Sequence, residues 1–153
     1  MPYLIDGHNL IGQMPGLSLA DPDDEAKLVR LVKRFCSRRR KHAVIIFDRG
    51  LPAGRSSLSG ANVEVRFAPE SSTADTLIRS RVQGLRDVRN WTVVTSDASL
   101  AEAARQRGAR VMASGEFAAA LTAEGKAADK QEPSLSKDEV ERWEDEFRKG
   151  KRK

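Results

Sequence analysis

Short apolar runs alternate with amphipathic stretches along most of this chain. Each apolar run is only a few residues long and ends near Gly, Pro, Asp or Ser, as strands of a buried parallel sheet do. The stretches between them carry apolar residues at helical spacing on one face and charged residues on another. The predicted strands are 3–5, 43–47, 63–67, 91–95 and 109–112, and helices are expected after residues 21, 71, 98 and 113. This alternation predicts an α/β domain with a central, mostly parallel sheet between layers of helices.

The end of the chain has a different pattern. Residues 122–135 are mainly Ala, Lys, Glu, Gly and Asp without apolar periodicity, so we expect a flexible linker after a domain at 1–121. Within 136–153, three apolar side chains recur at helical spacing: Val140, Trp143 and Phe147. They predict a short amphipathic helix followed by a basic tail. The apolar face of that helix would dock on the domain itself or bind a partner.

Composition narrows the class of protein. The chain has 153 residues, a net charge of +5 and a pI of about 9.7, which favours an acidic partner such as nucleic acid. No apolar run approaches the roughly 20 residues that a membrane span needs, and no secretory signal begins the chain. The only cysteine, Cys36, excludes a disulfide framework and a thiolate zinc site. A cytoplasmic location is therefore expected.

Four aspartates stand at equivalent positions in this pattern. Asp6, Asp48 and Asp97 each follow a predicted strand, and Asp75 lies in the first turn of the helix after strand 63–67. Each one has an ordinary explanation, such as a helix cap or an acid that complements the helix dipole. However, ligands of open parallel sheets bind beyond the carboxyl ends of the strands. Four acids at that edge therefore favour a shared site.

A cluster of carboxylates favours a metal ion. The acids would repel one another and raise one another's pKa values unless a cation lay among them. All-oxygen ligation suits Mg²⁺ or Mn²⁺, and the chain has no His/Cys cluster for zinc. Such a site can activate water and offset charge on a phosphoryl oxygen. Together with the basic composition, this site predicts hydrolysis of phosphodiester bonds. Asn9 would either hydrogen-bond within its own loop or hold the Asp6 side chain in place.

Basic residues supply candidate phosphate contacts. No acid occurs within 26–47, where Arg34 and Arg38 belong to a basic helical stripe; a solvated face and a phosphate-binding surface explain this stripe equally well. Arg49 follows the second strand-end aspartate and is a further candidate for substrate binding. His8 can contact the scissile phosphate, although a structural hydrogen bond is the favoured role for a loop histidine.

Four segments resemble the motif series of NYN domains, the PIN-like ribonucleases, and in particular their YacP-like branch. These segments are Leu-Ile-Asp-Gly-His-Asn-Leu-Ile at 4–11, Ile-Phe-Asp at 46–48, Ser-Thr-Ala-Asp at 72–75 and Val-Thr-Ser-Asp at 94–97. The resemblance covers residues 3–121, and the tail helix also resembles one in that branch. One departure is His8, where some relatives carry an aromatic residue.

The resemblance implies a PIN-like, Rossmann-like three-layer fold and a metal-dependent endoribonuclease, with some relatives acting on messenger RNA in association with ribosomes. By matched position, Asp6, Asp75 and Asp97 would be the catalytic acids that ligate the metal, and Asn9 would orient Asp6. Asp48 would be a further candidate metal ligand, at a matched position for which the resemblance does not itself imply direct ligation.

Two other functions are compatible with the sequence. The basic surface could hold RNA or a ribosome without cutting it, which predicts salt-sensitive binding that survives loss of the carboxylates. A strand-end aspartate such as Asp6 could also be the nucleophile of a phosphatase. That pattern needs a second acid two residues later, where this chain has His8.

Overall fold

The computed structural model describes residues 2–18, 22–48, 54–56 and 58–131. The chain divides into two compact units, residues 1–122 and 123–153. The elements are β1 (Tyr3–Asp6), α1 (Gly7–Ile11), α2 (Pro22–Arg39), β2 (Ala43–Phe47), β3 (Gly54–Arg55), β4 (Val63–Phe67), α3 (Ala74–Gly84), the 3-10 helix η1 (Val88–Asn90), β5 (Thr92–Val94), α4 (Ala98–Gln106), β6 (Arg110–Met112) and α5 (Ser114–Gln131).

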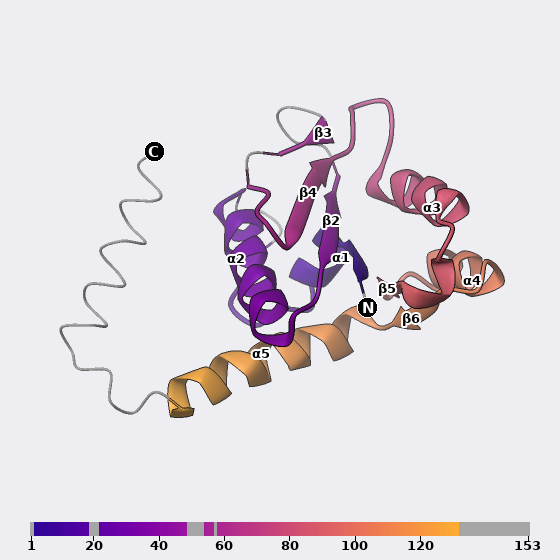
Figure 1. Cartoon of the computed structure of the whole chain (residues 1–153). Helices are drawn as coiled ribbons and strands as arrows, with labels where there is room; N and C mark the ends of the chain where they lie inside the picture. The colour runs from indigo at the N-terminus through magenta and orange to yellow at the C-terminus, as the bar shows by residue number, and fades with distance from the viewer. Residues whose placement is uncertain (1, 19–21, 49–53, 57, 132–153) are drawn as a thin grey trace. The chain divides into compact units, whose positions relative to one another are not determined.

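The strands form one six-stranded sheet in the order β3-β4-β2-β1-β5-β6 (Figure 1). Five strands are parallel, and the short β3 pairs antiparallel with β4 at the edge. The central strand is β1, where Ile5 lies opposite Ile45 of β2 on one side and Val94 of β5 on the other. The predicted mostly parallel sheet is therefore confirmed, and the first strand of the chain occupies its middle.

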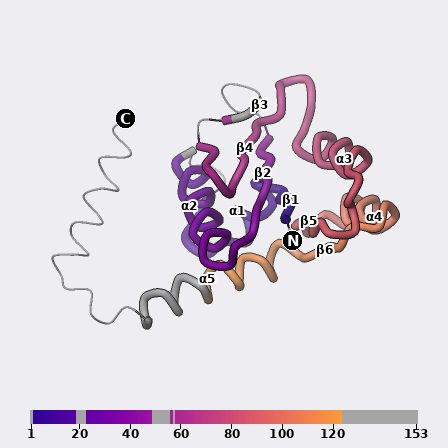
Figure 2. The backbone as a smooth tube through the Cα atoms, in the orientation of Figure 1, coloured from indigo at the N-terminus to yellow at the C-terminus, as the bar shows by residue number. Residues whose placement is uncertain are grey.

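Helices cover both faces of this sheet. In Figure 2, α3 and α4 lie on one side of the strands and α2 on the other. Successive residues of a strand point to opposite faces, so Leu4 joins the core under α3 and α4 while Ile5 joins the core under α1, α2 and the start of α5. Cys36 is buried in the second of these cores, and burial raises the pKa of its thiol to about 11. It is a packed side chain.

The last helix differs from the sequence expectation. We expected a linker over residues 122–135, but α5 continues to Gln131. The residues after Thr122 include several with high helix propensity, namely Ala, Glu, Lys and Gln, and this local preference outweighs the missing apolar period. The predicted helix at 136–153 lies outside the described residues. In the part of the chain that the structure describes, no helix is long and apolar enough to cross a bilayer.

Candidate active site

The four aspartates lie at the edge of the sheet where the parallel strands end. Asp6 is the last residue of β1 and lies opposite Ile46 of β2, and Asp48 follows the end of β2. Asp75 lies in the first turn of α3, and Asp97 is the N-cap of α4. Because β4 leads to α3 and β5 to α4, the parallel topology places all four at one edge.

The ionisation of Asp6 is strongly perturbed. Its pKa is raised to about 6, mainly by burial and further by the negative charges of Asp48 and Asp75. The hydroxyl of Thr95, whose Oγ1 donates to Asp6 Oδ2 at 3.3 Å, partly offsets this, as does the backbone N–H of Asn9. The structure therefore places a half-buried carboxylate where its negative charge is unfavourable unless a cation compensates it.

Asp48 links the end of β2 to the beginning of α3. Its Oδ1 accepts a hydrogen bond from the backbone N–H of Ala74 at 2.8 Å. Half of the Asp48 side chain remains exposed, so the other oxygen is accessible from outside. Beside it lies an open groove of about 410 Å³, which is lined by Asp48, Glu70, Ser71, Ser72 and Thr73.

His8 holds the end of β2 and the start of α2 together. Its Nδ1 accepts a hydrogen bond from the backbone N–H of Asp48 at 3.2 Å, so a neutral ring carries its proton on Nε2. Nε2 lies 3.3 Å from Glu25 Oε2, and the ring packs against Phe47 with centroids 5.1 Å apart. These are structural contacts of the kind favoured for His8. Glu25 was not among the predicted site residues, and its only signal in the sequence was its place among the acids that begin α2.

An arginine beside the aspartates was also missed. Arg79 Nε donates to Asp75 Oδ2 at 2.7 Å, and its Nη2 donates to Ser99 Oγ at 2.8 Å. The side chain thus connects α3 to α4 next to Asp75. Its signal in the sequence was the i, i+4 spacing from Asp75 on one helix.

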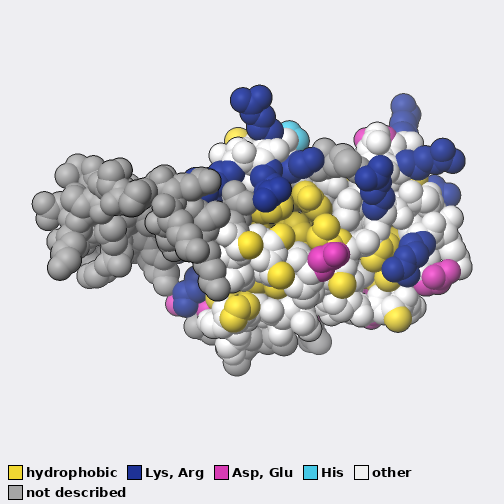
Figure 3. All heavy atoms as spheres, turned by 90° about the horizontal axis from the view of Figure 1, so that it is seen from below, with side chains coloured by type: hydrophobic (Ala, Val, Ile, Leu, Met, Phe, Trp, Pro, Cys, Tyr) yellow, Lys and Arg dark blue, Asp and Glu magenta, His cyan; other side chains and the backbone are white. Residues whose placement is uncertain are grey.

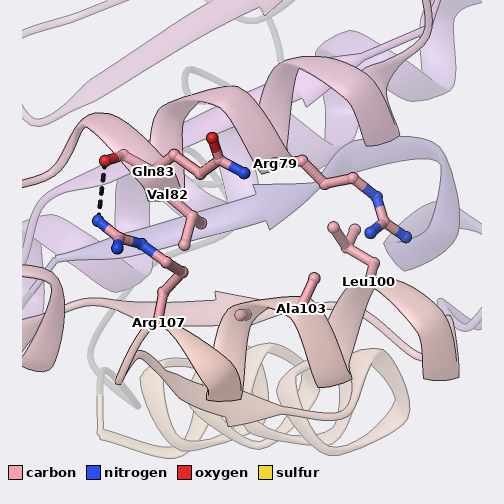
Figure 4. A pocket seen from close by; sticks show the side chains of 7 residues that line it. Arg79, Val82, Gln83, Leu100, Ala103 and Arg107 are labelled. Carbon is pink, nitrogen blue, oxygen red and sulfur yellow. Dashed lines mark hydrogen bonds between the residues drawn. The ribbon is translucent and has the colours of Figure 1, made fainter.

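Arg79 also lines a pocket of about 60 Å³ between α3 and α4 (Figure 4). Val82 and Leu100 contribute its apolar walls, and Arg107 closes the other end by donating to the carbonyl oxygen of Gln83 at 3.0 Å. A space of this size holds a few water molecules rather than a nucleotide. The pocket is therefore a feature of the helix packing beside the site.

Thr95 and Asp97 follow the end of β5, at the same edge of the sheet as Asp6. Asp97 Oδ1 accepts from the backbone N–H of Leu100 at 3.1 Å, so Asp97 caps α4. The Ser-x-x-Glu pattern of Ser99 and Glu102 favours Ser99 as the cap in the sequence, but Ser99 lies within the helix. The hydroxyl of Thr95 accepts from the backbone N–H of Asp97 at 3.1 Å while it donates to Asp6. Thr95 therefore couples the positions of two candidate metal ligands, a role that strand patterning did not indicate.

The side-chain oxygen of Asn9 is used differently from our expectation. We expected Asn9 to tie its own loop or to hold Asp6, but its Oδ1 accepts from the backbone N–H of Ser96 at 2.8 Å and from the hydroxyl of Ser114 at 2.6 Å. Ser114 is fully buried. Asn9 thus joins α1 to the loop before α4 and to the beginning of α5, while its backbone N–H is the group that favours ionised Asp6.

Gly7 allows the close packing beneath the site. A Cβ at this position would lie 2.5 Å from two ring carbons of Phe47 and 3.1 Å from Ile45 Cγ2. The described glycines with positive φ are Gly16 and Gly108, so the backbone conformation at Gly7 does not itself require a glycine. Close approach of α1 to β2 is therefore what requires the missing side chain.

The carboxylate oxygens are ligands of the type that a hard divalent cation prefers, but their arrangement is not that of a preformed metal site. Among the described residues, no group of three or more His, Cys, Asp or Glu side chains is arranged to hold a metal ion. Mg²⁺, however, commonly takes only one or two carboxylates and keeps several water ligands. Asp6 is the best candidate ligand, with Asp48 and Asp75 near enough to raise its pKa. One carboxylate oxygen of Asp97 already accepts the hydrogen bond that caps α4.

The predicted substrate-binding arginines do not gather at this edge. Arg34 and Arg38 lie in the second half of α2, about 14 and 20 Å along the helix from Glu25. The end of α2 lies by the beginning of the strands, where the Tyr3 ring meets Phe35 with centroids 6.1 Å apart. These two arginines therefore lie away from the aspartates, because α2 runs antiparallel to the strands, and their role in substrate binding stays a prediction. Arg49 lies outside the described residues.

Comparison with known proteins agrees with this architecture. The model of the YacP-like NYN domain matches residues 3–153. A crystal structure of Rae1 (YacP) from Bacillus subtilis is 22% identical, with a TM-score of 0.75 over 99% of this chain and 95% of that chain. A mutant of the same protein is 23% identical, with a TM-score of 0.70 over 85% of this chain and 79% of that chain. These similarities show the shared fold. No curated protein matches the sequence.

Proposed function

The chain belongs to the YacP-like NYN domain family, and from this premise we propose that it is a metal-dependent endoribonuclease that hydrolyses RNA phosphodiester bonds. The observation that carries the proposal is the position of Asp6. Its carboxylate is half-buried at the end of the central strand, with a pKa raised to about 6 by burial and by two neighbouring aspartates. Perturbed carboxylates of this kind are typical of functional sites.

In this proposal Asp6, together with Asp48 and Asp75, would hold Mg²⁺ or Mn²⁺. When bound, the cation would supply Lewis-acid stabilisation of phosphoryl charge and a lower pKa for water. Thr95 keeps Asp6 oriented through its hydroxyl, which lies 3.3 Å from Asp6 Oδ2. Arg79 holds Asp75 in place and brings a positive charge to the edge where a phosphate would arrive.

In this proposal Asp97 is a positioning residue, because it caps the beginning of α4. By capping that helix, it positions Ser99, which is the second partner of Arg79. Asn9 has a similar positioning role, because its two hydrogen bonds fix the loop that carries Asp97. The messenger RNA and ribosome link implied by the family resemblance is a further part of the proposal.

The test is a cleavage time course on long single-stranded RNA with Mg²⁺, Mn²⁺ or a chelator. The native chain is compared with Asp6→Asn and Asp75→Asn. Asp87→Asn is the matched control, since Asp87 is exposed on a different edge and accepts from the Trp91 indole at 3.2 Å, as an Asn oxygen also can. We expect metal-dependent cleavage that only the first two variants lose.

Unchanged cleavage by a folded Asp75→Asn variant would contradict this assignment. If the native chain leaves naked RNA intact under every condition, the assay is repeated with translating ribosomes. Cleavage there would establish a partner-dependent nuclease. Intact RNA in both assays would refute hydrolysis and favour the alternative of a non-catalytic RNA- or ribosome-binding module.

A further inference from the structure

The edge of the sheet where the strands begin is strongly basic. Three segments meet there, 38–42 before β2, 86–91 before β5 and 105–110 leading into β6, and we call them together the basic edge. They contain nine Lys or Arg residues and one acid, Asp87, a larger positive excess than the +5 of the whole chain. Nearly all of these basic side chains are exposed. The rest of the chain is therefore net acidic.

Backbone hydrogen bonds show that these segments are neighbours. The Tyr3 N–H donates to the carbonyl oxygen of His42 at 2.9 Å, and the Arg110 N–H donates to that of Trp91 at 3.0 Å. The four strands from β2 to β6 span about 15 Å at the spacing of a sheet. In Figure 1 β2 and β4 run upward, so the view from below in Figure 3 faces their beginnings. Lys and Arg lie mainly along the upper and right parts of this face, around hydrophobic side chains in the middle, and Asp and Glu are few.

Helix dipoles explain only part of this charge. Arg38, Arg39 and Arg105 lie in the last turns of α2 and α4, where cations are favourable. Arg40 lies beyond the last turn and has a φ of 54°, a conformation that Gly or Asn adopts with less strain. Arg110 lies in β6. A cation at Arg110 gains nothing from a helix end, and the charge at Arg40 is kept despite the strained backbone.

The two edges of the sheet thus carry opposite charge. The edge where strands end presents the four aspartates, which a polyanion can approach only with a compensating cation. The basic edge attracts a polyanion without any metal. A phosphate chain bound there lies at the far end of the strands from the candidate site, so it is not the bond being cut.

We propose that the basic edge binds the phosphate backbone of double-helical RNA, separately from the single strand that reaches the aspartates. The choice of RNA rests on the proposed function. A duplex fits better than a single strand because the described part of this edge offers little aromatic surface for stacking bases: Trp91 is partly buried and its indole N–H donates to Asp87, which leaves the small ring of His42 as the exposed one. Binding of this kind recognises shape and charge rather than sequence.

The test measures binding of the full chain to a fluorescein-labelled RNA duplex by anisotropy, in chelator and over a series of salt concentrations. The edge variant combines Arg40→Asn, which suits the left-handed backbone, with Arg89→Gln, which keeps the aliphatic part of that side chain beside Gly108. The matched control combines Lys27→Gln and Lys33→Gln, which lie before the last turns of α2.

We expect the edge variant to bind the duplex about tenfold more weakly and to reduce the salt slope by roughly 2, one for each lost phosphate contact. The control should stay within about twofold of the native chain, because loss of net charge alone has a small effect at physiological salt. The edge variant should also cleave an unstructured oligonucleotide at the native rate.

Native duplex affinity in the edge variant would overturn the proposal and favour an acidic protein as the partner of this edge. An equal loss in the control would overturn it as well, since net charge would then suffice. The binding arm needs no hydrolysis. If no protein cleaves RNA but only the edge variant loses duplex binding, the proposed function fails while this inference holds.

Discussion

Asp6 is the position where activity and stability are expected to conflict. Its carboxylate is the best candidate metal ligand, yet burial and the neighbouring aspartates make its ionised form unfavourable in the folded chain. The variant Asp6→Asn removes that charge at nearly constant volume, and the amide oxygen can still accept from the Thr95 hydroxyl. We therefore expect a variant that loses cleavage and gains stability.

The magnitude follows from the pKa of Asp6, which is raised from 3.8 to about 6 on folding. The folded chain binds this proton more tightly than the unfolded chain, so the contribution of Asp6 to stability falls as pH rises from about 4 to 6. Above pH 6 the ionised carboxylate lowers the free energy of unfolding by up to about 3 kcal/mol. Because the group is partly accessible to water, we expect an effect of roughly 1–3 kcal/mol. The raised pKa is a penalty at neutral pH, opposite in sign to that of a salt-bridged aspartate.

Thermal unfolding in chelator measures this penalty. At pH 8, Asp6→Asn should melt roughly 3–10 °C above the native chain, with the difference shrinking toward pH 4. Added Mg²⁺ should stabilise the native chain and leave the variant unchanged, because only the native chain keeps the ligand. Asp87→Asn, an exposed control, should melt as the native chain does at every pH. An Asp6→Asn variant that is less stable than the native chain at pH 8 would refute the reasoning.

Three further substitutions test the surroundings of Asp6. Gly7→Ala should destabilise the chain by about 1–3 kcal/mol in urea, because its Cβ would lie 2.5 Å from the Phe47 ring; an unchanged midpoint would show that the ring moves freely. Asn9→Ala should cost about 1–3 kcal/mol, since two donors lose their shared acceptor, and a loss too small to measure would contradict that role. Thr95→Val should move the acidic limb of the pH–rate profile to higher pH, because the hydroxyl lowers the pKa of Asp6, whereas Thr95→Ser should not; coincident profiles would contradict the coupling.

The strands and their ends could be predicted because a buried strand appears in the sequence as a short run of apolar residues. All five residues of β2 are buried, since helices cover both faces of the sheet, and an unbroken apolar run records that directly. The N-cap of α3 was equally local: Thr73 accepts from the backbone N–H of Thr76, within one turn. Asp6 and Asp48 followed from the same logic, as polar residues directly after buried strands.

The errors arose where two local signals competed. Asp97 and Ser99 could each cap the helix that follows, and the backbone begins that helix at Ala98, which selects Asp97. The Ala- and Lys-rich stretch after Thr122 has neither an apolar period nor a helix breaker apart from one glycine, and the structure extends α5 through it to Gln131. In the first case the start of the helix decides, and in the second helix propensity outweighs the missing apolar period.

The sequence by itself determined the α/β alternation, the buried strands and the presence of acids at strand ends, because burial and capping depend on residues within a few positions of one another. Tertiary structure alone decided which side chains meet. Strand order brings Thr95 to Asp6 across 89 positions, and Asn9 to Ser114 across 105. Helix direction likewise sends Arg38 to the edge opposite the aspartates. These contacts depend on long-range pairing and on helix orientation, for which periodicity along the chain carries no signal.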